Sequence, residues 1–339
     1  MKKKGLLVLL CVSCFLIAPT IVALPSARGE TINLTYSNFF PPTHIHGKLG
    51  DAWAKEIGKR TNGKVKITYF PGGALLKGPQ IYDGILKGVT DIGMSCFAYT
   101  RGRFPVMEAV DLPLGYPNGS MATSVINDFY KEFRPKELAE VKVLYLHAHG
   151  PGLLHSKKPV YRLEDLKGMK IRSTGFFAKV CKALGAVPVA MSMGGTYEAL
   201  QKGVVEATAS PIETLKGWKQ AEVVKYTTEC YSIGYTTGFY VMMNKEKWNS
   251  LPKDVQKVFD EVSAEWTARH AEAWEAIDVE GRKFTLSLGN TIIPLSEEES
   301  ARWAEAVRPV IDEWIKSAEG KGLPGKKYVK TLRRLIKKY

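Results

Sequence analysis

The stretch LEDLKGMKIRSTGFFAKVCKALGAVPVA, residues 163–190, contains the unit from which the fold can be worked out. Residues 170–172 have strand character, a Ser-Thr-Gly turn follows, residues 176–184 have helical character, and residues 187–190 return to strand character. A strand, a helix and a second strand in this order are typical of a sheet that is largely parallel and covered by helices. We therefore expect an α/β fold.

The same alternation extends in both directions along the chain. We expect strands at 31–36, 65–70, 91–94, 141–146, 204–209 and 239–243, and helices at 49–59, 80–86 and 196–202. The second series of elements repeats the architecture of the first, and strand character resumes at 239–243 after that series is complete. The chain is therefore expected to cross more than once between two lobes.

One helix should be much longer than the others. From just after Pro252 toward Phe284, apolar residues recur mostly at three- and four-residue intervals. Roughly thirty helical residues would make a rod of about 45 Å, long enough to contact both lobes. Two further amphipathic helices are expected at 297–315 and 328–336, and we expect their tryptophans to lie in the core.

The N-terminal segment indicates export. Lysines at positions 2–4 precede an apolar run at 6–24 and a stretch of small residues, the order of a secretory signal peptide cleaved near Gly29. A membrane anchor is the competing interpretation, but Pro19 interrupts the run. A lipoprotein anchored at Cys14 is a third interpretation, which is disfavoured because the apolar run continues past that cysteine. The sequence therefore predicts a periplasmic protein.

Cysteine and charge content narrow the class further. The mature chain would keep Cys96, Cys181 and Cys230, an odd number of widely separated thiols, which argues against a disulfide scaffold. The formal net charge is +14, and a basic balance attracts anions of several kinds. Export and the lack of a recognition motif argue against nucleic acid as the partner, so the basic C-terminus is expected to be a solvated helix face.

Enzyme motifs are missing from the sequence. There is no Gly-x-Ser-x-Gly elbow, no phosphate-binding Gly-Lys-Ser/Thr loop, no His-Glu-x-x-His, and no Cys-x-x-Cys beyond the N-terminal apolar run. Two His-x-His pairs, His44 with His46 and His147 with His149, keep a metal-binding receptor in view. Because neither pair has an acidic segment beside it, capping, hydrogen bonding or lining a pocket is the favoured role. We expect no enzyme activity, no cofactor and no metal.

Arg172 is the strongest candidate for ligand binding on the residues alone. It closes the expected strand at 170–172, and open α/β sheets bind ligands at the carboxyl ends of their strands. A guanidinium can hold a carboxylate by two parallel charge-assisted hydrogen bonds. The alternative is an ordinary exposed arginine.

The sequence resembles the solute receptors of tripartite ATP-independent periplasmic (TRAP) transporters, of the dicarboxylate-receptor type. The resemblance extends along essentially the whole mature chain. Residues 163–172, which we call the signature segment, are similar to the family's signature, which ends in a carboxylate-binding arginine. Supporting matches are Asn62-Gly63-Lys64-Val65, Phe70-Pro71-Gly72-Gly73, Asp111-Leu112-Pro113, the helix at 197–203 and Leu251-Pro252.

The resemblance implies a two-lobed periplasmic-binding-protein fold, class II-like, with a long helix spanning both lobes. It also implies lobe closure over a ligand and delivery to TRAP permease subunits driven by an ion gradient. We expect a signal peptide at 1–29, lobe I at 30–150 plus 239–282, and lobe II at 151–238 plus 283–339. The resemblance leaves open whether the receptor is a monomer or a homodimer, and whether it serves transport or sensing.

The resemblance also suggests site residues. Arg172 falls on the family's carboxylate-binding arginine. Four other positions fall where members contact ligand, the last three of them replacing residues typical of sialic-acid-type receptors: Asn38, Ser95, Met193 and Ser210. A second arginine found in several members is absent, and Gly152 occupies its place.

The absence of a second arginine weakens a dicarboxylate assignment. Further candidates for the cleft are Phe39, Phe97, Tyr99, Tyr235 and His149. One guanidinium among aromatic side chains predicts a monocarboxylate with an apolar or aromatic portion. The alternatives are a C4-dicarboxylate receptor of the same family and a metal-binding or sensory periplasmic receptor.

Overall fold

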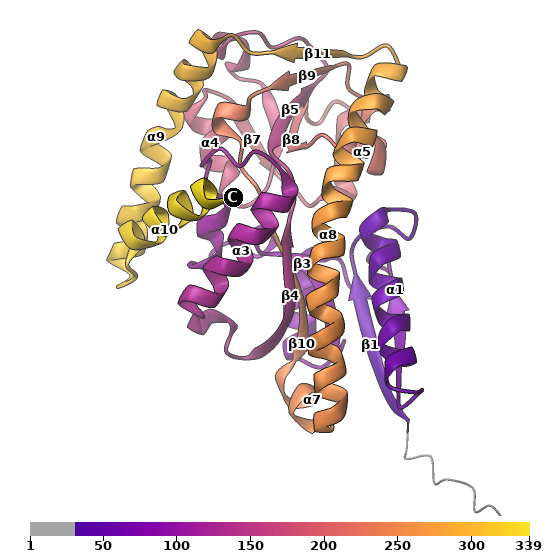
Figure 1. Ribbon diagram of the computed structural model, residues 1–339. Helices are drawn as coiled ribbons and strands as arrows, with labels where there is room; N and C mark the ends of the chain where they lie inside the picture. Colours follow the sequence, from indigo (N-terminus) through magenta and orange to yellow (C-terminus); the bar gives the residue numbers. More distant parts are fainter. Residues whose placement is uncertain (1–30) are drawn as a thin grey trace, which may run out of the picture.

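Two β-sheets, each covered by helices, form two lobes in the computed structural model, which describes residues 31–339 (Figure 1). The first sheet has the order β2-β1-β3-β10-β4 and consists of β1 (Ile32–Asn38), β2 (Val65–Phe70), β3 (Ile92–Cys96), β4 (Val141–Ala148) and β10 (Gly238–Asn244). The second has the order β11-β9-β5-β8-β6-β7 and consists of β5 (Gly152–Ser156), β6 (Lys170–Ser173), β7 (Val187–Ala190), β8 (Ala207–Pro211), β9 (Tyr226–Glu229) and β11 (Thr291–Pro294). The expected signal peptide lies outside the described residues.

The chain crosses between the sheets more than once, as expected. After β9 it returns to the first sheet, where β10 pairs antiparallel with both β3 and β4. It later re-enters the second sheet as β11, parallel to β9. Each lobe is therefore built from separate parts of the chain. The lobe boundaries expected from the sequence stay a prediction.

The β-α-β unit at 163–190 forms as predicted. Strand β6 pairs in parallel with β7 on one side and with β8 on the other. Helix α4 (Phe177–Ala183) connects β6 to β7 and buries Phe177, Val180 and Cys181. Because the three strands run the same way, their carboxyl ends meet at one edge of the second sheet.

The remaining helices cover the two sheets. They are α1 (Ile45–Arg60), α2 (Ile81–Leu86), α3 (Gly119–Phe133), α5 (Thr196–Gln201), α6 (Thr214–Gly217), α7 (Lys245–Ser250), α8 (Lys253–Ser287), α9 (Glu297–Gly320) and α10 (Gly325–Lys338). Within residues 31–339, none of the helices combines the length and the apolar character that a bilayer span requires.

Helix α8 connects the two lobes mechanically. Its 35 residues make a rod of about 52 Å, slightly longer than expected. It contacts α1, α3 and β4 of the first lobe and α6 and β11 of the second (Figure 1). Trp266 and Trp274 anchor it in the core, each 1% exposed. The C-terminal tryptophans Trp303 and Trp314 are also buried, which confirms the sequence prediction for them.

The C-terminal helix connects outer helices of the two lobes. Helix α10 packs on α9 and also on α3 of the first lobe. Its Arg334 contacts Glu132 of α3 at 2.6 Å, and its Lys338 contacts Asp128 at 2.9 Å. The basic residues of this helix are exposed, apart from such ion pairs, as expected of a solvated face.

Candidate functional site

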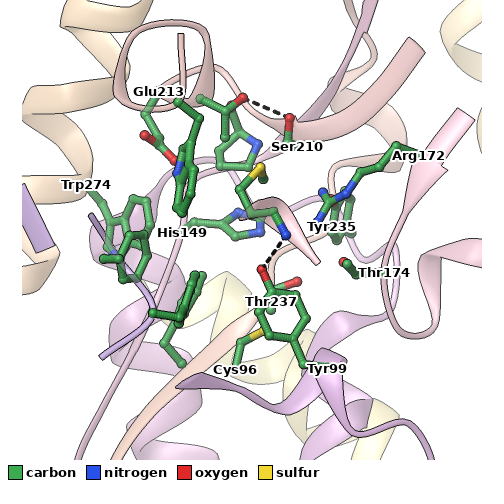
Figure 2. A pocket seen from close by; sticks show the side chains of 17 residues that line it. Cys96, Tyr99, His149, Arg172, Thr174, Ser210, Glu213, Tyr235, Thr237 and Trp274 are labelled. Atoms are coloured by element: carbon green, nitrogen blue, oxygen red, sulfur yellow. Dashed lines mark hydrogen bonds between the residues drawn. The ribbon is translucent and has the colours of Figure 1, made fainter. Parts of the chain in front are cut away.

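A cavity opens where the two sheets face each other, with about 400 Å³ of atom-free space, part of it continuous with solvent (Figure 2). From the first lobe, its walls come from the residues just after β1, β3 and β4 and from the start of β10. From the second lobe, they come from the carboxyl ends of β6 and β8 and the turn after β7. Trp274 of α8 closes one side. This is the edge at which α/β sheets bind ligands.

Arg172 lies in the wall of this cavity and is 2% exposed. Its Nε donates a hydrogen bond to the carbonyl of Met191 at 3.1 Å, and its Nη1 donates a long one to the carbonyl of Ala209 at 3.4 Å. Within residues 31–339, no carboxylate lies within 4.0 Å of the guanidinium. A buried cation without a counterion is costly, so the site is suited to an anion from outside the chain.

The two lobes contact each other beside Arg172. Tyr99, which follows β3 of the first lobe, accepts a hydrogen bond through its hydroxyl from the backbone N–H of Met193 in the second lobe, at 3.0 Å. Burial raises the pKa of Tyr99, which keeps the phenol protonated and able to donate a hydrogen bond of its own. The described structure therefore has the cleft closed at this point.

His149 adds a neutral imidazole to the cavity. Burial, and to a smaller extent the charge of Arg172, lowers its pKa to about 4. Its Nδ1 donates to the carbonyl of Gly150, since a carbonyl can only accept. Nε2 of the neutral ring is therefore an acceptor.

A carboxylate, Glu213, lies in the cavity wall two residues after β8 and is 2% exposed. His44, which caps the start of α1, donates from Nε2 to Oε2 of Glu213 at 3.0 Å and thereby links the lobes. The backbone N–H of Glu213 donates to Asp278 of α8 at 3.1 Å. Burial, followed by the charge of Glu213, raises the pKa of Asp278 to about 8, so that carboxyl is neutral at pH 7.

Aromatic side chains form much of the remaining wall. Phe39 lies nearly parallel to Trp218, with ring centroids 6.3 Å apart and planes 15° apart. It is also nearly parallel to Phe239, at 6.2 Å and 13°. Phe40 and Trp274 line the same side. Such flat apolar surfaces favour an aromatic or otherwise apolar ligand portion.

Seven of the ten site residues expected from the sequence meet in this cavity: Arg172, Met193, Ser210, Phe39, Tyr99, Tyr235 and His149. The other three do not line it. Asn38 bonds the backbone N–H of Phe40 at 2.9 Å, Ser95 donates to the carbonyl of Gly78 at 2.8 Å, and Phe97 is fully buried in the first lobe's core. These three support the wall from behind, and binding of ligand by any of the ten stays a prediction.

Other lining residues were missed by sequence reasoning. Trp218 follows a four-residue helix, where no periodic pattern marks its direction. Trp274 belongs to the apolar stripe of α8, which reads as core. Glu213 carries the one available signal, because it follows the end of β8, and Arg172 likewise lies near the end of β6.

Gly152 explains why a second arginine has no room here. A Cβ atom built on Gly152 would lie 1.9 Å from a ring carbon of Tyr235, so the ring packs directly on the glycine backbone. The Tyr235 hydroxyl donates to the carbonyl of Ala209 at 3.0 Å, which holds the ring in place. Any side chain at 152 would displace Tyr235.

The His-x-His pairs divide between two environments. His149 lines the cavity, and His44 lies behind it in contact with Glu213. His46 and His147 lie in the core beside His270, and burial lowers the pKa of these three histidines. Nδ1 of His46 and Nδ1 of His270 are 2.7 Å apart, a hydrogen-bond distance. Two nitrogens on one tetrahedral zinc would lie about 3.3 Å apart.

The ring planes give a second argument about this histidine cluster. The planes of His147 and His270 are 12° apart with centroids at 4.2 Å, so these rings stack. The lone pair of an imidazole nitrogen lies in its ring plane, so stacked rings do not converge on one ion. The geometry favours a hydrogen-bonded stack of neutral imidazoles over a metal site, although Nε2 of His46 and of His147 lack a protein partner among residues 31–339.

Comparison with known proteins identifies a matching family and similar solved structures. Residues 36–317 match the family DctP, bacterial extracellular solute-binding protein, family 7. Among solved structures, a TRAP solute-binding protein from a marine metagenome, specific for aromatic acid ligands and in complex with metahydroxyphenylacetate, is 34% identical, with a TM-score of 0.85 over 91% of this chain and 99% of that chain.

Curated relatives point to different ligands. The monocarboxylate 2-oxoacid-binding periplasmic protein of Nostoc sp. is 28% identical, covering 72% of this chain and 69% of its own. The C4-dicarboxylate-binding periplasmic protein DctP of Rhodobacter capsulatus is 27% identical, covering 85% and 87%. The family match spans most of the chain and agrees with the two-lobed fold. The protein belongs to the solute-binding receptors of TRAP transporters, family 7 of the bacterial extracellular solute-binding proteins.

Proposed function

We propose that this receptor binds a small organic monocarboxylate with an aromatic or apolar portion, closes over it, and delivers it to TRAP permease subunits. The observation that carries the proposal is Arg172, a buried guanidinium in the cavity wall without an acidic partner among the described residues. A ligand carboxylate would supply the missing counterion by charge-assisted hydrogen bonds. Contacts from both lobes would then favour the closed form.

The limited positive charge supports one carboxylate rather than two. Among the described residues that line the cavity, Arg172 is the one arginine or lysine. Tyr235 occupies the space beside Gly152 that a second arginine would need. A second ligand carboxylate would be desolvated without a cation to pair with, which is costly. The aromatic wall supports an apolar or aromatic remainder.

The relatives agree in part. The marine receptor, at 34% identity, is specific for aromatic acids, and the Nostoc relative binds monocarboxylate 2-oxoacids by its name. The Rhodobacter relative, named for C4-dicarboxylates, supports the alternative that this chain binds such an acid. The lone guanidinium supports the proposal of a monocarboxylate over a C4-dicarboxylate.

Calorimetry tests the proposal directly. The purified mature protein would first be unfolded to release and identify any copurified acid by mass spectrometry, then refolded for titration with benzoate, phenylacetate, pyruvate, succinate and malate. We expect the aromatic monocarboxylates to bind more tightly than succinate or malate. Much tighter binding of the C4-dicarboxylates would overturn the monocarboxylate assignment, and binding of none of these acids would overturn the proposal. Metal analysis of the same sample tests the histidine alternative.

Export belongs to the same proposal. The family consists of periplasmic receptors, and we propose that cleavage near Gly29 releases the chain into the periplasm. N-terminal sequencing of protein recovered from the periplasm tests this, and a start far from residue 30 would contradict it. Neighbouring genes for a permease or for a sensor kinase would separate transport from sensing.

A further inference from the structure

Glu213 is the second charged side chain in the cavity wall, and Figure 2 places it on the opposite side from Arg172. It is held from three directions. His44 donates to Oε2 of Glu213 at 3.0 Å, and the backbone N–H of Glu213 donates to Asp278 at 3.1 Å. A Cβ atom on Gly217 would lie 2.5 Å from Oε2, so the chain turns tightly around the carboxylate.

The negative charge of Glu213 is not neutralised by these contacts. Nδ1 of His44 accepts a hydrogen bond from the backbone N–H of His46 at 3.2 Å, as the cap of α1. That nitrogen therefore carries no proton, and the ring that donates from Nε2 to Glu213 is neutral. Asp278, the other carboxyl in contact, is held in its neutral form at pH 7. The group of three thus keeps one negative charge at the cavity wall.

Oε1 of Glu213 has no hydrogen-bond donor within residues 31–339. This oxygen keeps some accessible surface, so a hydrogen-bond donor of a ligand can supply the missing partner. Nε2 of His149, which also lines the cavity, is a second acceptor without a donor among the described residues. The cavity is therefore polarised, with donors around Arg172 and acceptors at Glu213 and His149.

We infer that Glu213 determines specificity, accepting a hydrogen bond from a hydroxyl remote from the ligand's carboxylate and rejecting a second carboxylate at that position. The inference rests on the proposed function, because it assumes that the first carboxylate binds at Arg172. Attraction to a donor and repulsion of an anion act together, which is how binding sites separate similar ligands. The ligand class is thus a hydroxylated aromatic or apolar monocarboxylate.

A purely structural role is the competing explanation. The His44–Glu213 contact links the lobes, so removing it would disturb closure for every ligand alike. A change in selectivity between ligands would not follow from that role. The test therefore compares ratios of dissociation constants, in which any general loss of closure cancels.

The experiment titrates the parent, Glu213→Gln and Glu213→Asp with benzoate, 3-hydroxybenzoate, 4-hydroxybenzoate, isophthalate and terephthalate. Glutamine keeps an oxygen for His44 but loses the charge, whereas aspartate keeps the charge. For the parent, we expect the better hydroxybenzoate to bind about tenfold more tightly than benzoate, and each phthalate at least tenfold more weakly. In Glu213→Gln, the preference for the better hydroxybenzoate over benzoate and the preference for benzoate over each phthalate should both shrink toward one, by about fivefold or more. In Glu213→Asp, each phthalate should still bind more weakly than benzoate.

Each outcome bears on one claim. If the parent binds none of the monocarboxylates, the proposed function fails and this inference with it. If the parent binds benzoate but does not separate it from the phthalates, or if Glu213→Gln keeps both parental ratios, the proposed function stands and this inference is wrong. If Glu213→Gln does not fold, the ratios of dissociation constants measured for the parent alone test the inference.

Discussion

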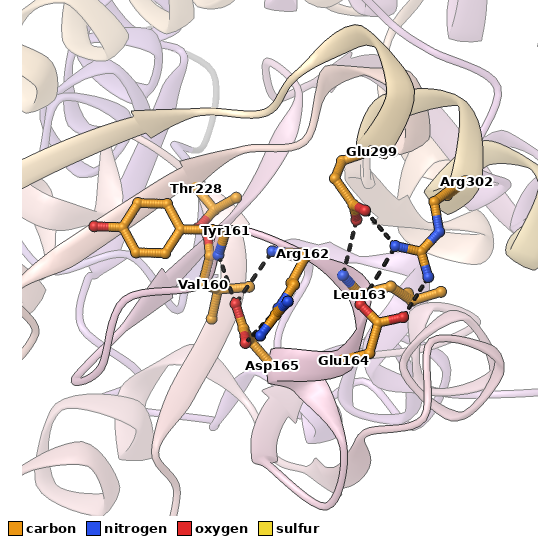
Figure 3. A network of polar contacts seen from close by, with 9 residues as sticks. All are labelled: Val160, Tyr161, Arg162, Leu163, Glu164, Asp165, Thr228, Glu299 and Arg302. Atoms are coloured by element: carbon orange, nitrogen blue, oxygen red, sulfur yellow. Dashed lines mark hydrogen bonds and ion pairs between the residues drawn. The ribbon is translucent and has the colours of Figure 1, made fainter.

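The two ends of the signature segment, residues 163–172, carry charges in opposite situations. At the outer end, Glu164 pairs with Arg302 of α9, and Glu299 accepts from both Arg302 and the backbone N–H of Leu163 (Figure 3). At the inner end, Arg172 is 2% exposed, and its guanidinium donates to two backbone carbonyls of the described residues, with no carboxylate in contact there. Arg302, by contrast, has a side chain that is 40% exposed and two carboxylate partners.

This difference separates a structural charge from a binding charge. An exposed, paired network contributes little free energy and is easily replaced, because water already solvates its members. A buried cation without a counterion destabilises the free protein, and that cost can be offset when a ligand supplies the anion. The same short segment thus carries a weak surface contact to α9 at one end and a prepared ligand site at the other.

The largest expected effect is at the inner end. Arg172→Ala should weaken binding of an aromatic monocarboxylate by about 3–5 kcal/mol, because the carboxylate would be buried without its partner. The free variant should unfold at a temperature no lower than the parent does, because an uncompensated buried charge has been removed. Calorimetry and ligand-free thermal unfolding measure the two effects. Parental affinity in Arg172→Ala would break the comparison.

The pH dependence should also differ between buried and exposed carboxyls. Burial and Glu213 raise the pKa of Asp278 to about 8, whereas the hydrogen bond from Arg302 lowers the pKa of exposed Glu164. Between about pH 4 and 8 the native state keeps the Asp278 proton that the unfolded state releases, so Asp278 makes stability fall as pH rises. Asp278→Asn should therefore gain stability relative to the parent, by up to about 1.4 kcal/mol per pH unit in that window.

Denaturant unfolding of the parent and of Asp278→Asn at pH 5, 6, 7 and 8 measures this dependence. Asparagine keeps an oxygen to accept from the N–H of Glu213, so the local hydrogen bond is preserved. Glu164→Gln is the matched control, and its small effect should be a loss of stability that is nearly the same from pH 5 to 8, because the lowered pKa keeps Glu164 ionised across that range. A free energy difference between Asp278→Asn and the parent that is the same at all four pH values would contradict the assignment.

A smaller effect is expected from the aromatic wall. Trp218→Ala should weaken binding of benzoate by about tenfold, because the ring that lies parallel to Phe39 is lost. An aliphatic acid such as pyruvate should lose less, since it covers less of that ring. Titration of both acids against the variant measures the difference. Equal losses for both would show that Trp218 acts on closure rather than on the aromatic portion.

The fold could be predicted from the sequence where hydrophobic patterns are strong. The strands at 65–70 and 187–190 and the long α8 follow from alternation and from helical periodicity. The strands β5, β9 and β11 and the helix α3 were not expected. Strands β9 and β11 are four residues long and, unlike the equally short β7, do not belong to a strand–helix–strand pattern in the sequence. They form because their partners lie nearby in space.

The site could be predicted in part, for a related reason. Arg172 lies one residue before the end of β6 in a recognisable segment, and the edge at which strands end is set by topology. Asn38 and Ser95 also lie at strand ends, but their side chains turn to neighbours within the first lobe. Glu213 depends on a contact with His44, 169 positions away in the sequence, and local pattern carries no information about such pairs.

The smallest expected effect belongs to the outer end of the signature segment. Arg302→Ala removes two exposed ion pairs and should cost about 1 kcal/mol or less of unfolding free energy, less still at high salt. Ligand affinity should stay parental, because the strand β6 that carries Arg172 is held by β7 and β8 rather than by α9. Denaturant unfolding at low and high salt, with calorimetry on the same samples, measures both quantities. If Arg302→Ala weakened binding as strongly as Arg172→Ala, the two ends would act as one unit and the separation drawn between them would be wrong.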